Sequence, residues 1–261
     1  MPCLELYLLG SPRIEIDGAP IKADTRKALA LLAWLALTPG TQQRAAAVDL
    51  LWPNYAPSRG RANLRRTLYA LRRAIGPDWF VADHGTIALS DDSDVWVDVA
   101  EFGELLGGCE RNGHRTTELC VLCAKAHARA VRLYRGDLMA GFGIRDSQEF
   151  DEWHRSEGEN LRLEMIGALQ KLVRWHSARG VVDLALSHAR RWLSLDPLNE
   201  RAHRQLMRLY AAQGHRAAAL HQYRHCVHLL RDELGITPEQ RTRALHHSIV
   251  EGERISLVAR P

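Results

Sequence analysis

The sequence of 261 residues lacks the short motifs that mark several common classes of enzyme. None of its four lysines follows a glycine, so it contains no Gly-Lys-Ser/Thr loop for binding nucleotide phosphates. It also has no Gly-x-Ser-x-Gly pattern, which positions a nucleophilic serine, and no His-Glu-x-x-His pattern, which binds catalytic zinc. These absences predict a protein that is not an enzyme.

Long apolar runs and targeting segments are missing as well. The apolar run at residues 28–37 is shorter than the roughly 20 residues that cross a bilayer. The first ten residues lack the basic start and the small-residue cleavage site of a signal peptide. We therefore expect a cytoplasmic protein with no membrane partner. In that compartment, five cysteines indicate thiols or a metal site rather than disulfides.

Acidic residues are absent from the stretch between Pro53 and Pro77, which holds six arginines. This local imbalance carries more information than the net charge of the chain, which is only +4. Residues 58–75 predict an amphipathic helix with Ser58 as its N-cap. Its apolar residues recur at helical spacing and form one stripe: Leu64, Leu68, Leu71 and Ile75.

Arginine side chains bind phosphates and guanine edges, so we interpret this segment as a DNA-reading helix. Base edges are assigned to three residues on the side away from the stripe and to Asn63 beside that side, so the set is Asn63, Arg66, Tyr69 and Arg73. Phosphates are assigned to the other four arginines: Arg59, Arg61, Arg65 and Arg72. The alternative is a solvated arginine-rich face whose side-chain stems cover apolar surface.

The segments around this helix predict a winged helix-turn-helix domain over residues 1–97. Two alternating apolar stretches and a short piece at residues 21–22 predict strands, and two further helices are expected at about residues 25–37 and 43–52. Residues 79–90 then predict a hairpin. This order of strands, three helices and a hairpin is that of a winged helix-turn-helix domain. In such a domain the third helix enters the major groove.

Residues 98–261 predict an all-α domain with tetratricopeptide-like repeats. Ala178-Arg179-Gly180 recurs 34 residues later as Ala212-Gln213-Gly214. A helix–turn–helix unit of 34 residues is the period of tetratricopeptide repeats. The alternative is coincidence within a helical domain, because only two copies are visible. The predicted fold class is therefore mainly α with a small β component.

A cluster of three cysteines and one histidine predicts a structural zinc site. The set is Cys109, His114, Cys120 and Cys123. Thiolates and imidazole suit the tetrahedral coordination of zinc, and four protein ligands leave no open position for catalysis. His127 is the substitute ligand if His114 is not used. The alternatives are buried thiols, which pack as small apolar groups, and a redox-active pair.

Several motifs together resemble the SARP/BTAD family of bacterial transcriptional activators, whose N-terminal domain is of the OmpR type. The similar segments include Leu51-Trp52, Asn63-Leu64-Arg65 leading to Leu71-Arg72-Arg73, and LYRGDLMAGF, LDPLNERAH and LRDELGITP in the helical half. The resemblance covers about residues 4–250. It implies that residues 58–75 form the recognition helix. Many relatives also carry a comparable Cys, His and Cys-x2-Cys set.

The resemblance further implies operators made of direct repeats, and a helical domain that packs on the DNA-binding domain and mediates self-association or reception of a signal. We therefore predict a transcriptional activator whose partners are double-stranded DNA, RNA polymerase or another protein, and a second copy in a homodimer.

The sequence departs from the family pattern at the wing tip, residues 82–85, which has no Arg or Lys and carries Asp83. The alternative is an interaction adaptor whose winged domain has lost specific DNA binding. Relatives often continue into an ATPase module, so the chain is either a short regulator or the N-terminal part of a longer one.

Overall fold

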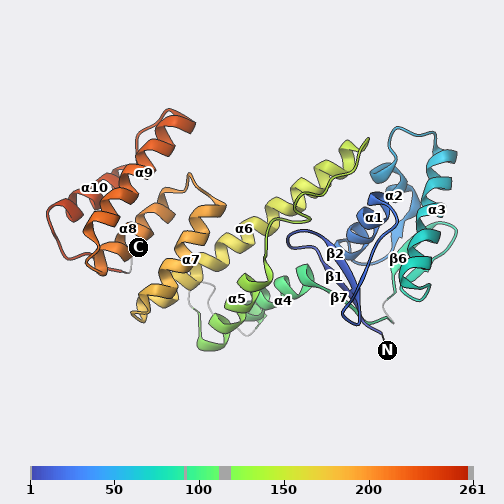
Figure 1. Cartoon of the computed structure of the whole chain (residues 1–261), viewed down its shortest axis with the longest axis horizontal. Coiled ribbons are helices and arrows are strands. Elements are labelled where there is room, and N and C mark those ends of the chain that lie inside the picture. The colour runs from blue at the N-terminus through green and yellow to red at the C-terminus, as the bar shows by residue number, and fades with distance from the viewer. Residues whose placement is uncertain (1, 91–92, 112–118, 258–261) are drawn as a thin grey trace. The chain divides into compact units, whose positions relative to one another are not determined.

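A computed structural model describes residues 2–90, 93–111 and 119–257 of the chain (Figure 1). Helices dominate, with a small β component on the N-terminal side, which confirms the predicted fold class. The chain forms two compact units, which are Met1–Leu105 with Arg132–Arg162 and Leu106–Val131 with Leu163–Pro261. The predicted boundary at residue 97 falls where the last strand ends and a helix begins; the division into domains there stays a prediction.

The first unit begins with a four-stranded sheet in the order β3-β2-β1-β7. Strand β1 is antiparallel to β2 and parallel to β7, so a segment some ninety residues later completes the sheet. Leu4 and Leu6 alternate with half-buried residues along β1 and are fully buried, as expected for a strand with one face on the core. The strands are β1 (Leu4–Tyr7), β2 (Arg13–Ile16), β3 (Ala19–Ile21) and β7 (Val95–Val97).

Three helices and a second sheet form the helix-turn-helix part. The side chain of Thr25 caps the first helix by accepting a hydrogen bond from the Ala28 N–H at 3.1 Å. The hairpin predicted after the third helix is present, and a two-residue strand joins it in the order β4-β6-β5. These elements are α1 (Arg26–Leu37), β4 (Gln42–Gln43), α2 (Arg44–Leu51), α3 (Pro57–Ile75), β5 (Phe80–Ala82) and β6 (Thr86–Leu89).

The start of α3 differs from the prediction. Ser58 is not the N-cap, because the helix already begins at Pro57 and Ala56 holds the cap position. Proline suits the first helical position, since its missing N–H would have no partner there and its fixed φ fits the helix. No side chain caps this helix end.

A buried carboxylate joins the N-terminal sheet to the later residues of the first unit. Asp98 begins α4 (Asp98–Arg111), and its side chain is only 1% exposed. It accepts hydrogen bonds from the backbone N–H groups of Leu8 at 2.7 Å and Leu9 at 3.0 Å. Arg135 adds an ion pair at 3.0 Å. Burial raises the pKa of Asp98, while these three donors stabilise its charged form.

The start of α6 (Gln148–Ala178) makes a second connection within this unit. The Ser147 hydroxyl accepts a hydrogen bond from the Phe150 N–H at 3.2 Å, and so caps α6. The same hydroxyl donates to the carbonyl of Leu50, near the end of α2. Helix α2 is therefore hydrogen-bonded directly to the residue that caps α6.

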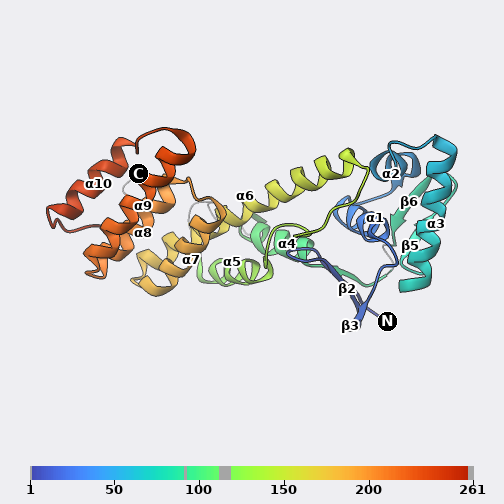
Figure 2. The ribbon, with the colours of Figure 1, turned by 45° about the horizontal axis from the view of Figure 1, so that its top comes forward.

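The second unit consists of helices, in which α7 to α10 pack against their neighbours (Figure 2). Helices α7 and α9 begin 34 residues apart, at Val182 and Arg216. The turns before them share one hydrogen bond, from the Val181 N–H to the carbonyl of His176 and, 34 residues on, from His215 to Tyr210. The predicted 34-residue spacing thus recurs as a repeated turn. The helices are α5 (Val121–Leu133), α7 (Val182–Leu195), α8 (Glu200–Ala212), α9 (Arg216–Leu234) and α10 (Gln240–Val250).

Acidification should destabilise the second unit through two stacked histidines. His188 lies against His176 with ring centroids 5.4 Å apart, and burial, aided by the charge of His176 and of Arg191, lowers the pKa of His188 from 6.5 to about 4. Below pH 6.5, His188 takes up a proton in the unfolded chain but stays neutral in the folded chain. The free energy of unfolding therefore falls as the pH drops towards 4. We expect a loss of about 1–2 kcal/mol at pH 5, allowing for partial exposure of the ring.

This expectation can be checked by thermal unfolding between pH 8 and pH 5. His188→Phe keeps a flat ring but cannot be protonated, so its stability should depend less on pH than that of the wild type. Equal pH dependence in the two proteins would show that His188 is not the group responsible.

Candidate nucleic-acid interface

Helix α3 separates its apolar and cationic residues onto different faces. The predicted stripe of Leu64, Leu68, Leu71 and Ile75 is buried, together with Gly60 and Thr67. All six arginines are exposed, and Tyr69 between them is 70% exposed. Asn63 is half-buried at the edge of the stripe. The structure therefore brings all eight predicted DNA-binding residues onto one helix whose apolar side faces the core.

The exposed arginines are not neutralised within the protein. None of the six has an ion pair with a carboxylate among the residues that the structure describes. Arg59 lies over the ring of Tyr55 at 4.9 Å, which is a cation–π contact and leaves its charge in place. An uncompensated row of guanidinium groups attracts a polyanion.

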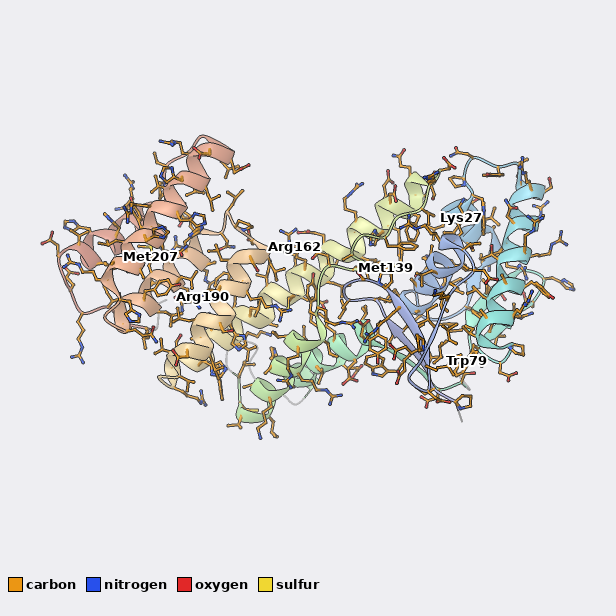
Figure 3. The ribbon with its side chains drawn as sticks, in the orientation of Figure 1. Lys27, Trp79, Met139, Arg162, Arg190 and Met207 are labelled. Carbon is orange, nitrogen blue, oxygen red and sulfur yellow. The ribbon has the colours of Figure 1, made fainter. Side chains whose placement is uncertain are left out.

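Both ends of the helix-turn-helix are fixed by hydrogen bonds. Trp79 donates its indole N–H to the carbonyl of Ile75 at 2.5 Å, and thereby satisfies the C-terminal end of α3. Lys27 donates to the carbonyl of Leu51 at 2.6 Å, at the end of α2. Figure 3 labels both side chains. Burial lowers the pKa of Lys27, while nearby Asp146 opposes this change.

Gly60 lets α3 approach α2 closely, a role that the sequence analysis did not identify. A Cβ atom at this position would lie 2.4 Å from Cγ1 of Val48, far inside van der Waals contact. Valine is stiff about its Cα–Cβ bond, so it cannot easily turn aside. The small residue therefore sets the spacing between the two helices of the motif.

Gly60→Ala should lower the free energy of unfolding by about 1–3 kcal/mol because it overpacks this contact. Alanine normally stabilises a helix by about 1 kcal/mol relative to glycine, so the sign is opposite to propensity. Gly167→Ala is the matched control, since Gly167 lies inside α6 and a Cβ atom added there would meet nothing within 4 Å outside the helix's own backbone. In chemical denaturation, Val48→Ala should offset part of the loss from Gly60→Ala; strictly additive effects would contradict the contact.

A positive charge lies beside the wing tip, and it comes from a residue of α2 rather than from the wing itself. Arg44, the first residue of α2, donates from Nη1 to the carbonyl of Asp83 at the wing tip, at 2.8 Å. The Asp83 carboxylate accepts hydrogen bonds from the N–H groups of Thr86 and Gly85, which lower its pKa. Sequence reasoning missed Arg44 because only the fold brings residues 44 and 83 together.

Only part of the predicted zinc set lies among the described side chains. The side chain of Cys109 and the whole of His114 lie outside them. Cys120 is a free thiol, whereas Cys123 is buried and disulfide-bonded, so the expectation of thiols rather than disulfides is wrong for Cys123. Within the described part of the chain, no three His, Cys, Asp or Glu residues are grouped to hold a metal.

Among the described residues, no helix is both long enough and apolar enough to span a membrane.

Comparisons with known proteins identify regulators of transcription. The family described as "Bacterial transcriptional activator domain" matches residues 97–250. The transcriptional regulatory protein MoaR1 of Mycobacterium tuberculosis is 24% identical over 262 residues, which cover 95% of this chain and 79% of MoaR1. The transcriptional regulatory protein EmbR of the same species is also 24% identical, over 95% of this chain and 63% of EmbR.

A solved structure of Mycobacterium tuberculosis EmbR in complex with a low-affinity phosphopeptide has a similar fold. The TM-score is 0.73 at 22% identity, and the match covers 98% of this chain and 67% of that one. The likeness supports the fold of the whole described chain, including the N-terminal sheet and the helical half. The similar proteins are regulators of transcription rather than enzymes, in agreement with the prediction from sequence.

Proposed function

Because this chain belongs to the bacterial transcriptional activator domain family, a family of transcriptional regulators, we propose that it binds double-stranded DNA sequence-specifically through α3. The observation that carries the proposal is the outward face of this helix, where six exposed arginines have no carboxylate partner among the described residues. A helix with one buried stripe and one cationic face suits the major groove, which is wide enough to admit it.

The residues of this face are divided by their positions. Arg66, Tyr69 and Arg73 lie on the side away from the buried stripe and, with Asn63, are proposed to contact base edges. The other four arginines are proposed to bind phosphates and so to fix the orientation of the helix: Arg59, Arg61, Arg65 and Arg72.

The helical-repeat half is proposed to mediate contacts with protein. Repeats of paired helices present extended surfaces that suit a peptide or a protein partner. We propose a second copy of the chain, RNA polymerase or a signalling protein as the partner, and operators built from direct repeats. The activator role belongs to the same proposal.

The salt dependence of DNA binding tests the proposal against the adaptor alternative. Binding of the full chain to duplex DNA should weaken steeply between about 50 and 200 mM salt, with a slope near −0.9 for each phosphate neutralised. Fluorescence anisotropy with labelled duplexes measures this slope. An adaptor without a DNA interface would show little binding at any of these concentrations, and that result would overturn the proposal.

We also propose that the reduced protein holds a structural zinc ion through Cys109, Cys120, Cys123 and one histidine. The described residues fit this in part, since the Cys123 N–H donates to Sγ of Cys120 at 3.4 Å and so holds the two sulfur-bearing residues close together. His127 donates from Nδ1 to the carbonyl of Cys123 at 2.9 Å, which leaves Nε2 buried with no hydrogen-bond partner. Zinc-bound histidines typically donate their other ring N–H to a carbonyl in this way, which supports His127 as the alternative to His114.

Elemental analysis of protein purified with a thiol reductant and no chelator tests the zinc site. About one zinc per chain is expected, as in other four-ligand structural sites, and Cys120→Ser should abolish it. His114→Gln and His127→Gln, compared side by side, identify the histidine by which of them loses the metal. Metal-free protein with its cysteines intact and reduced would refute the site.

A further inference from the structure

An open cavity of about 660 Å³ lies between the start of α2, the start of α3 and the wing tip. Its lining includes three arginines and a histidine, which are Arg44, Arg61, Arg65 and His84. Asp49 is the acidic residue in the lining, so positive charge is in excess. We call this feature the α2–wing cavity.

Two helix N-termini open onto the α2–wing cavity. Residues 43–45 at the start of α2 and residues 57–58 at the start of α3 are part of its lining. Neither helix has a side-chain cap, and neither has an acidic residue in its first turn. Helix N-termini leave N–H groups without intrahelical partners and carry partial positive charge. An anion in this cavity would therefore meet backbone donors as well as guanidinium groups.

The wing is held in place beside this charge. The Arg44 N–H donates to the carbonyl of Gly85 at 2.8 Å, while its guanidinium donates to the carbonyl of Asp83. These two bonds tie the wing tip to the start of α2. The remaining donors of the Arg44 guanidinium are available to a ligand, since one Nη1 bond uses only one of its five N–H groups.

We infer that the α2–wing cavity binds a phosphate of the DNA backbone, which the arginines, His84 and the two helix starts would hold together. The inference rests on the proposed function and adds Arg44, Ser58 and His84 to the DNA interface. It accounts for a wing without lysine or arginine: the cation comes from α2. Because the cavity joins α2, α3 and the wing, one phosphate there fixes the angle at which α3 enters the groove.

The test is Arg44→Gln in the full chain, because glutamine keeps a polar side chain but carries no charge. Affinity for random-sequence duplex at low salt should fall about tenfold, and the salt slope should become shallower by about 1. The specific and the random duplex should lose affinity alike. Arg155→Gln is the matched control, since Arg155 is exposed in α6 and does not line the cavity; it should change neither quantity.

His84→Lys guards against a trivial loss of folding, because it should tighten binding and steepen the slope by about 1. Suppose that Arg44→Gln keeps the wild-type salt slope of DNA binding while Arg66→Ala still weakens specific binding. This result would refute phosphate binding in the cavity and leave the proposed function intact. Thermal unfolding with inorganic phosphate, at the ionic strength of a chloride reference, distinguishes the source of the anion. A saturable stabilisation that Arg44→Gln abolishes, together with a DNA affinity and salt slope that Arg44→Gln leaves unchanged, would reassign the cavity to a free phosphate compound and contradict a DNA phosphate.

Discussion

Alanine in place of Asp98 should lower the free energy of unfolding of the protein by about 3–5 kcal/mol, the range seen when one partner of a buried ion pair is removed. The carboxylate is almost fully buried and accepts hydrogen bonds from Leu8, Leu9 and Arg135. Without it, two backbone N–H groups inside the core lose their acceptor, and each orphaned donor costs about 1–3 kcal/mol. Arg135 would lose its ion pair with this carboxylate and keep only its hydrogen bond to the Leu9 carbonyl.

Amide hydrogen exchange is the most direct readout of this change, since the Leu8 and Leu9 N–H groups should lose protection before the rest of the sheet. Urea unfolding supplies the free energy. Asp98→Asn keeps the volume and one acceptor, so it should cost less than alanine. Asp24→Ala is the control, because Asp24 is exposed and should be nearly neutral. A loss below about 1 kcal/mol for Asp98→Ala would show that water replaces the carboxylate.

Arg66→Ala should weaken binding to a specific operator by about 1–3 kcal/mol, or roughly 5- to 150-fold, and change binding to random DNA far less. A guanidinium that donates two hydrogen bonds to a guanine contributes only where that base is present. Arg73→Ala is expected to behave in the same way at a different base position. Together the two changes should remove most of the preference for the operator.

Arg65→Ala is the matched comparison, because Arg65 is exposed on the same helix and is assigned to a phosphate. It should weaken binding to operator and random duplexes by the same factor and make the salt slope shallower by about 1. Equal losses for Arg66→Ala on both kinds of duplex would make it a phosphate contact. A loss confined to the operator for Arg65→Ala would contradict its assigned role.

Local patterns in the sequence predicted the elements that depend on neighbouring residues. The stripe of α3, with its period of 3.6 residues, gave the buried and exposed faces that the structure has. The 34-residue spacing corresponds to two turns with the same hydrogen bond, from Val181 to His176 and from His215 to Tyr210. The stripe arises within a few helical turns and the 34-residue spacing arises from two similar helix pairs in succession, so each leaves a visible period.

Features that depend on distant segments were not visible in the sequence. Strand β7 pairs in parallel with β1, although about ninety residues separate them in the sequence. No local pattern indicates that Asp98 is buried and accepts a hydrogen bond from the Leu8 N–H. In the sequence, Gly60 is a residue of low helix propensity inside a helix. Its close contact with Val48 is visible only in the structure. The Ser58 cap was wrong because Pro57 can begin a helix by itself.

Selection of binding sites from a randomised duplex pool, carried out in parallel with the wild type and Arg66→Ala, tests most directly whether α3 reads DNA. The wild type should enrich a defined motif, and the variant should lose the preference at one base position, a guanine if the contact is the usual bidentate one. Enrichment of no motif by the wild type, or of an identical motif by both proteins, would contradict the account.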